Sequence, residues 1–162
     1  MSPEDEALLR RAVAIAAHAR AAGNHPFGAL LADASGAVLV EAGNAVVTAN
    51  DPTAHAEMVL VRAAAAQFPS TVLASCSLYA STEPCAMCAG GTYWTGIGRV
   101  VYAMSESELL RLTGESSANP TMHLGCRVVF DAGQRRVEVI GPAPPGSPLA
   151  SDAVAVHRGF WS

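Results

Sequence analysis

The order of helical and extended segments in this sequence predicts an α/β fold. A helix-like stretch and a hairpin of two extended runs come first, and a strand–helix–strand unit follows within residues 77–104. Such a unit places its two strands parallel and joins them by a right-handed crossover. Neither an internal repeat nor a Pro/Gly-rich interior linker divides the 162 residues. We therefore expect one domain over residues 1–162.

The first half of the chain predicts a helix and a hairpin. A pattern similar to a capping box opens the helix at Ser2, and Gly23 ends it. The runs 27–32 and 37–47 are apolar and partly β-branched, and a turn-forming tetrapeptide separates them. This arrangement is typical of a β-hairpin.

Two more helices are predicted next to strand ends. One covers residues 51–67, with Asp51 as its N-cap and Pro52 in its first turn. The other has Pro84 in its first turn, where the missing proline N–H costs no hydrogen bond. The elements after residue 67 are a strand at 77–80, a helix at 84–95, a strand at 99–104, a helix at 106–112, a loop at 113–125, a helix or strand at 126–130, a strand at 136–140, a turn-rich connector at 142–148 and a helix at 150–160.

Two short motifs hold the residues that can bind a metal. His55 and Glu57 form an H-x-E pair, and Pro84 precedes two thiols, Cys85 and Cys88, in a P-C-x-x-C motif. Positions i and i+3 share a face of a helix, so both thiolates can reach one ion. A catalytic zinc takes three protein ligands and keeps its fourth position for water. We therefore predict a Zn²⁺ held by His55, Cys85 and Cys88, in the pattern of zinc nucleobase deaminases.

Glu57 is not needed as a ligand and is the predicted catalytic residue. It stands two residues beyond His55, so the two side chains need not point in the same direction. A carboxylate beside the activated water can take a proton as general base. It can then return that proton to the leaving nitrogen as general acid.

The C-x-x-C pair by itself also fits a redox pair or half of a structural zinc site. The upstream H-x-E, between two helix-start signals, favours a catalytic site. A non-catalytic zinc-stabilised binding protein is a third class of function; it would need a fourth protein ligand, for which His25 is the nearby candidate. Cys76 and Cys126 lie outside the motifs and are expected to be small buried residues.

Composition and charge favour a cytoplasmic enzyme that acts on a small molecule. The chain has a formal net charge of −4, and its ten basic residues are all Arg. It therefore has no general attraction to phosphate, and a nucleic-acid partner is not expected. The acidic start is unlike a signal peptide, and no apolar run is long enough to span a membrane. Four cysteines, two of them committed to metal, suggest a reducing compartment.

Several longer motifs extend the pattern over roughly residues 5–104. They are Asn24-His25-Pro26-Phe27-Gly28-Ala29, Gly43-Asn44, Asn50-Asp51-Pro52-Thr53-Ala54-His55-Ala56-Glu57 and Glu83-Pro84-Cys85-Ala86-Met87-Cys88 with Tyr93-Trp94. With these motifs the sequence resembles the cytidine-deaminase-like superfamily, in particular its guanine deaminase and cytosine deaminase-like branch. The resemblance implies a three-layer α-β-α fold, in which a five-stranded mixed sheet has helices on both faces, and it implies a homodimer.

The resemblance also implies a pocket for a base. It suggests that Asn44 hydrogen-bonds the base and that Trp94 helps to wall the pocket, and it places Phe27 and Ala56 among the substrate-binding candidates. Guanine deaminases similar to this chain carry an acidic residue soon after the fourth strand that pairs with the purine edge. Residues 112–119 offer no clear counterpart except Glu115.

Two aromatic residues outside these motifs are also candidates to shape the pocket. His123 lies in the predicted loop, where it equally fits a solvated side chain. Trp161 lies near the end of the chain, where it fits either a packed helix end or a ring that stacks over a base.

We predict a zinc-dependent hydrolase that deaminates a small nucleobase and releases ammonia. Guanine to xanthine is the first candidate reaction, and deamination of cytosine or a related pyrimidine or triazine is the next. A tRNA adenosine deaminase that forms inosine is the alternative in another substrate class, and residues 51–57 are shared with such enzymes. The acidic charge and the absence of Lys stand against it.

Overall fold

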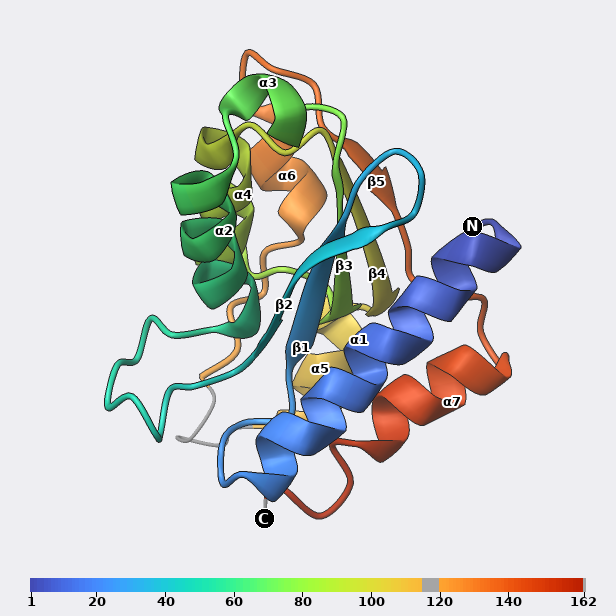
Figure 1. Cartoon of the computed structure of the whole chain (residues 1–162). Coiled ribbons are helices and arrows are strands. Elements are labelled where there is room, and N and C mark those ends of the chain that lie inside the picture. The colour runs from blue at the N-terminus through green and yellow to red at the C-terminus, as the bar shows by residue number, and fades with distance from the viewer. Residues whose placement is uncertain (115–119, 162) are drawn as a thin grey trace.

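The computed structural model describes residues 1–114 and 120–161, and its centre is a mixed sheet in the order β2-β1-β3-β4-β5. β1 pairs antiparallel with β2 and with β3, whereas β4 is parallel to both β3 and β5 (Figure 1). The strands are β1 (Gly28–Ala32), β2 (Val38–Gly43), β3 (Ser77–Thr82), β4 (Arg99–Met104) and β5 (Glu138–Ile140).

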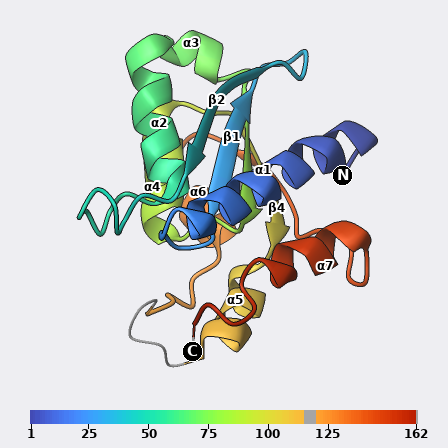
Figure 2. The ribbon, with the colours of Figure 1, turned by 60° about the horizontal axis from the view of Figure 1, so that its bottom comes forward.

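Helices cover both faces of this sheet, which confirms the predicted three-layer fold. α1 and α7 lie side by side on one face, and α2, α4 and α6 cover the other (Figures 1 and 2). The helices are α1 (Pro3–Ala21), α2 (Ala56–Gln67), α3 (Ser70–Leu73), α4 (Ala86–Thr95), α5 (Glu106–Thr113), α6 (Cys126–Asp131) and α7 (Pro148–Ala155). No helix within the described ranges is long and apolar enough to cross a membrane.

The sheet divides the core into two apolar clusters, as the side chains of its inner strand β1 show. Successive side chains of a strand point to opposite faces. Leu30 accordingly packs in the cluster that contains Leu9 of α1, and Leu31 packs in the cluster that contains Leu60 of α2. All five residues of β1 are buried, which explains why this run is apolar throughout.

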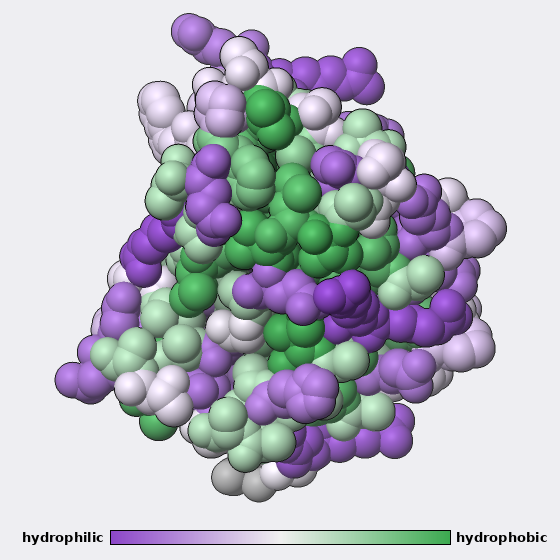
Figure 3. All heavy atoms as spheres, in the orientation of Figure 1, coloured by the Kyte–Doolittle hydropathy of each residue, from purple (hydrophilic) through white to green (hydrophobic). Residues whose placement is uncertain are grey.

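The edge strand β2 is only half-buried. Val38, Leu39 and Val40 are each partly exposed. Apolar side chains gather near the middle of the face on which Figure 1 draws β2, with hydrophilic residues around them (Figure 3). The antiparallel pairing of β1 with β2 confirms the predicted hairpin. Its second strand ends at Gly43 and not at residue 47.

The two helices that begin next to the metal motifs start later than predicted. α2 begins at Ala56, and His55 is its N-cap in extended conformation. Asp51 is not the N-cap, because its Oδ1 accepts a hydrogen bond from the Thr53 N–H at 2.8 Å and so closes a local turn. α4 begins at Ala86 with Cys85 as N-cap, so Pro84 precedes the helix and does not lie in its first turn.

The C-terminal third differs from the prediction in several boundaries. Residues 126–130, which fit a helix or a strand, form α6, and α3 was not predicted. α7 runs from Pro148 to Ala155 and not over 150–160, because the Ser147 side chain caps it by accepting from the Ala150 N–H at 3.2 Å. The chain then continues in turns to Trp161.

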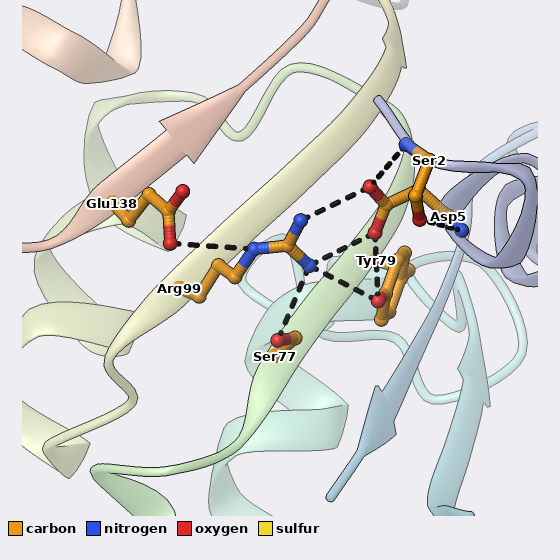
Figure 4. Close-up of polar contacts among 6 residues, drawn as sticks. All are labelled: Ser2, Asp5, Ser77, Tyr79, Arg99 and Glu138. Atoms are coloured by element: carbon orange, nitrogen blue, oxygen red, sulfur yellow. Dashed lines mark hydrogen bonds and ion pairs between the residues drawn. The ribbon is translucent and has the colours of Figure 1, made fainter. Parts of the chain in front are cut away.

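A buried ionic network ties the start of α1 to the sheet (Figure 4). Arg99 of β4 donates two hydrogen bonds to the Asp5 carboxylate, at 2.9 and 3.0 Å, and the Tyr79 hydroxyl donates a third at 3.0 Å. Asp5 also closes the capping box with Ser2. Burial alone would raise the pKa of Asp5, but the Arg99 guanidinium and these hydrogen bonds hold that pKa well below its usual range.

We expect Asp5→Ala to destabilise the protein by about 3 kcal/mol, because the substitution removes the buried partner of the largely buried Arg99 charge. Arg99 also pairs with Glu138, but that side chain is 57% exposed. The matched variant Glu138→Ala should therefore cost about 1 kcal/mol or less. Urea unfolding of both variants measures the difference; equal losses would contradict the importance of the buried pair.

Candidate metal centre and active site

Three predicted metal ligands converge at the starts of α2 and α4. The Nδ1 atom of His55 lies 3.7 Å from the Cys85 sulfur and 3.6 Å from the Cys88 sulfur, and the two sulfurs are 3.6 Å apart. His55 and Cys85 are the N-cap residues of α2 and α4, and Cys88 lies one turn into α4. The packing of α2 against α4 therefore brings the two motifs together.

These separations fit a tetrahedral zinc ion. Zn–S and Zn–N bonds of ordinary length imply about 3.8 Å between two sulfurs and about 3.6 Å between a sulfur and a nitrogen. His55, Cys85 and Cys88 are the complete set of clustered His, Cys, Asp and Glu ligand atoms found in residues 1–114 and 120–161. The cluster therefore offers three protein ligands, the number typical of catalytic zinc sites, and His25 is not among its members in the described residues.

The cysteine pair is poised to lose its remaining proton to solvent when a metal binds. The contact with the Cys88 sulfur, followed by that with His55, lowers the pKa of Cys85 to about 4. The contact with Cys85, together with burial, raises the pKa of Cys88. Zinc binds thiolates, so metal uptake removes the proton that this pair otherwise shares.

We expect Cys85→Ala and Cys88→Ala each to lose zinc and to melt at a lower temperature, because metal binding also holds the starts of α2 and α4 together. Cys76→Ala is the matched control, since Cys76 is a buried free thiol outside the cluster. Elemental analysis and thermal unfolding measure both effects. Full zinc content in the Cys85 and Cys88 variants would overturn the ligand assignment.

Glu57 lies beside the ligands in the first turn of α2. Its side chain is 6% exposed, and its Oε2 atom is 3.7 Å from the Cys88 sulfur. Burial raises the pKa of Glu57 to about 7, with a further contribution from the negative charge of Cys85. A carboxyl group with this pKa can exchange a proton near neutral pH.

A cavity of about 370 Å³ opens onto Glu57, His55 and Cys85. Its wall also includes Phe27 and His25, and a segment at residues 120–122. A larger cavity of about 510 Å³ lies between β4, α5 and α7, but it contains none of the metal ligands. The smaller cavity is therefore the candidate active site.

Asn44 is not part of the wall of this cavity, but it is hydrogen-bonded to Phe27, which is. It is 3% exposed, its backbone N–H donates to the Phe27 carbonyl at 2.9 Å, and its Oδ1 accepts from the Val46 N–H at 3.1 Å. Its Nδ2 atom is buried and has no partner in the described part of the chain. A buried amide donor without an acceptor is costly unless a ligand supplies one.

The other substrate-binding candidates differ in their positions. Phe27 lines the cavity. Ala56 packs its methyl group into the core, and as the first residue of α2 it has a backbone N–H without an intrahelical acceptor. His123 is exposed and is not part of the cavity wall. Glu115 falls outside the described residues.

Trp94 does not wall the cavity within one chain, contrary to the prediction. Its side chain is 85% exposed. Nine positions separate Trp94 from Cys85, which is about two and a half helical turns, so its ring points away from the side of α4 that carries the cysteines.

Trp161 reaches the site indirectly through an aromatic cluster. Its ring lies 5.5 Å from that of His25 and 6.0 Å from that of Phe27, and both of these residues line the cavity. It also stacks on His157 and donates its indole N–H to the Nδ1 atom of that ring at 3.2 Å. The end of the chain therefore supports the cavity wall from behind.

His157 should make stability depend on pH. It is 1% exposed, and burial, with a smaller effect of the Arg20 charge, lowers its pKa from 6.5 to about 4. Between these values the unfolded chain binds more protons than the folded chain, so stability is highest above pH 6.5 and is lost as the pH falls toward 4.

We expect His157 to account for a loss of about 2 kcal/mol in unfolding free energy between pH 7.5 and pH 5. Urea unfolding of the wild type and of His157→Phe at both pH values measures this contribution. The variant should lose about 2 kcal/mol less than the wild type over this range. An identical pH dependence in both proteins would contradict the assignment to His157.

Two carboxylates in the cavity wall, Glu83 and Glu106, were not among the predicted site residues. They follow two parallel strands: Glu83 comes directly after β3, and Glu106 comes one residue later after β4. The carboxyl ends of parallel strands are the usual position of ligand sites in α/β sheets. That rule, applied to the predicted strands, would have identified both residues.

The fold and the site together define the class of the protein. A helix-covered mixed sheet, an open site of one histidine and two cysteines, and a buried glutamate are the parts of a zinc-dependent hydrolytic enzyme. A family model described as the cytidine and deoxycytidylate deaminase zinc-binding region matches residues 2–104. The chain belongs to this family and is a zinc-dependent deaminase.

Known relatives of the chain have different substrates in their names. A probable cytosine deaminase of Schizosaccharomyces pombe is 37% identical over 99% of this chain and 94% of its own. A tRNA-specific adenosine deaminase of Haemophilus influenzae is 37% identical over 63% of this chain and 59% of its own. The solved guanine deaminase of Nitrosomonas europaea is 25% identical, with a TM-score of 0.76 over 98% of this chain and 84% of that one.

Proposed function

We propose that the substrate is a small free nucleobase, with guanine to xanthine as the first candidate reaction and deamination of cytosine or a related pyrimidine or triazine as the next. The observation that carries this proposal is the cavity of about 370 Å³ at Glu57, His55 and Cys85. Its size suits a single small molecule. The likeness to a cytosine deaminase along nearly the whole chain and to a guanine deaminase in fold supports a base as the substrate.

Glu57 would carry the proton in this reaction. Zinc held by His55, Cys85 and Cys88 would supply Lewis-acid activation of water. Glu57 accepts a proton as the water oxygen bonds to the amine-bearing ring carbon. It then donates the proton to the nitrogen, the carbon–nitrogen bond breaks, and ammonia leaves.

The buried surroundings of Glu57 suit this role. Because burial raises the pKa of its carboxyl group to about 7, the group can accept and return a proton at neutral pH. The orphaned Nδ2 atom of Asn44 supports a further role in binding, since a ring nitrogen or carbonyl of the base would supply the acceptor that this donor lacks.

A tRNA substrate is the alternative, and the similarity to tRNA-specific adenosine deaminases favours it. The charge of the chain stands against it, because RNA affinity depends strongly on cationic contacts to phosphate and the net charge here is −4. An assay that compares ammonia release from free bases with inosine formation in a tRNA anticodon loop distinguishes the two substrate classes.

We also propose a homodimer in a reducing compartment such as the cytoplasm. Trp94 of α4 is 85% exposed and Val128 of the adjacent α6 is 59% exposed, so both could be covered by a second copy of the chain. The four free cysteines are consistent with a reducing environment.

We expect Glu57→Gln to keep its zinc and to lose turnover by about 10²-fold or more, because an amide of the same shape cannot accept the proton. Ammonia release from guanine, cytosine, isocytosine, ammeline and their nucleosides, together with metal content, measures this effect. Glu108→Gln is the matched control, because Glu108 lies on α5 but does not line this cavity. Formation of inosine in a tRNA anticodon loop, without release of ammonia from any base, would replace the free-base proposal with the alternative.

A further inference from the structure

The cavity of about 510 Å³ lies outside the active site, at the carboxyl ends of two parallel strands. Residues 103–105 at the end of β4 and residues between 142 and 146, just beyond β5, form part of its wall. α5 and α7, which lie beside the end of β4, supply most of the remainder (Figure 2). The crevice outside the carboxyl ends of parallel strands is the usual position of ligand sites in α/β sheets.

The wall of this cavity changes from apolar at its base to cationic at its mouth. Ala103, Met104 and Ala143 are 1%, 3% and 2% exposed, so they form the buried base. Arg111 and Arg158, by contrast, are exposed residues of the same wall. An apolar lining with a few charged groups is typical of sites for small molecules.

The two arginines have few partners of their own. The Arg158 guanidinium has no hydrogen bond or ion pair within residues 1–114 and 120–161, and only its backbone carbonyl is engaged, by Arg20. Arg111 pairs with Glu108, but its side chain is 67% exposed, and such surface pairs contribute little. The wall therefore carries two guanidinium groups and one carboxylate, a local charge of +1 in a chain of net charge −4.

We propose that this cavity is a second ligand site, which binds a small organic phosphate of the size of a nucleoside monophosphate. Its apolar or planar body would lie on the buried base of the cavity, and its phosphate would accept hydrogen bonds from Arg111 and Arg158 at the mouth. A guanidinium group matches phosphate oxygens in geometry and charge. The cavity is larger than the active-site cavity of about 370 Å³, so it suits a molecule larger than a free base.

α5 is shared by the two cavities. Glu106 and Leu109 line the active-site cavity, whereas Glu108 and Arg111 of the same helix line the second one. A ligand held by Arg111 therefore contacts the helix that forms part of the active-site wall. Binding at the two sites should be coupled, and such coupling is reciprocal.

Calorimetric titration of the zinc-loaded wild type tests the site directly. The probes are guanosine monophosphate, cytidine monophosphate, guanosine and inorganic phosphate. At least one monophosphate should bind, and guanosine and inorganic phosphate should bind about 10-fold more weakly or less, because each lacks one half of the recognised molecule. Absence of binding by both monophosphates, or binding of inorganic phosphate with equal affinity, would overturn the proposal.

Charge variants show whether the arginines of the mouth hold the phosphate. Arg158→Gln and Arg111→Gln should each raise the dissociation constant of the monophosphate about 10-fold. Arg136→Gln is the matched control, because it makes the same change of charge at an exposed residue outside both cavities. An equal loss in Arg136→Gln would indicate general attraction to anions and overturn the proposal.

A filling variant locates the ligand. Ala150 lines the cavity from α7, so Ala150→Phe should block the monophosphate, whereas Ala155→Phe changes an exposed residue of the same helix outside the cavity. Thermal unfolding and zinc content establish that both variants fold. Unchanged binding of the monophosphate in folded Ala150→Phe and in Arg158→Gln would place it elsewhere, for instance in the active-site cavity, and overturn the proposal.

The coupling through α5 is measured with the best base from the ammonia assay, so this part alone rests on the proposed function. Saturating monophosphate should change KM for that base about 5-fold or more in the wild type and not in Arg158→Gln with Arg111→Gln. An unchanged KM in the wild type, or an equal change in the double variant, would overturn the coupling. If no base releases ammonia, the proposed function fails, and the calorimetric titrations still decide whether the second site exists.

Discussion

The carboxylate of Glu83 holds three segments together around the metal ligands. Glu83 follows β3 and lies two residues before Cys85. Its oxygens accept hydrogen bonds from the backbone N–H groups at the starts of α5 and α6. These groups have no acceptor within their own helices. One side chain therefore fixes the position of the cysteine motif relative to two helices that are distant in sequence, and it leaves the carboxylate of Glu106 facing the cavity.

The candidate site concentrates negative charge in a small buried volume. Glu57, Glu83 and Glu106 line one cavity together with the Cys85 thiol. Burial raises the pKa values of Glu57 and Glu106, to about 7 and about 8. A bound Zn²⁺ would offset much of this charge, so we infer that metal binding, protonation and stability are coupled in this region. Gathering like charges in a buried volume lowers the stability of the folded protein, as is typical of functional sites.

Other contacts supply stability. The Asp5–Arg99 pair joins the start of α1 to β4, and the two apolar clusters fill the space between the sheet and its helices. The C-terminal segment has an intermediate role, because Trp161 and His157 pack against the ring of Phe27 in the cavity wall. Changes in that segment should therefore affect both stability and the shape of the cavity.

The sequence by itself determined the α/β class, the order of most elements and the metal motif, because apolar periodicity and ligand spacing are local properties of the chain. It also identified His55, Cys85, Cys88 and Glu57, which the structure brings together. Tertiary structure alone decided that α2 and α4 start at Ala56 and Ala86, that Trp94 is exposed, and that Glu106 faces the cavity. These features depend on how separate elements pack and on which distant N–H groups donate hydrogen bonds to each carboxylate. The spacing of neighbouring residues encodes neither the packing nor these hydrogen bonds.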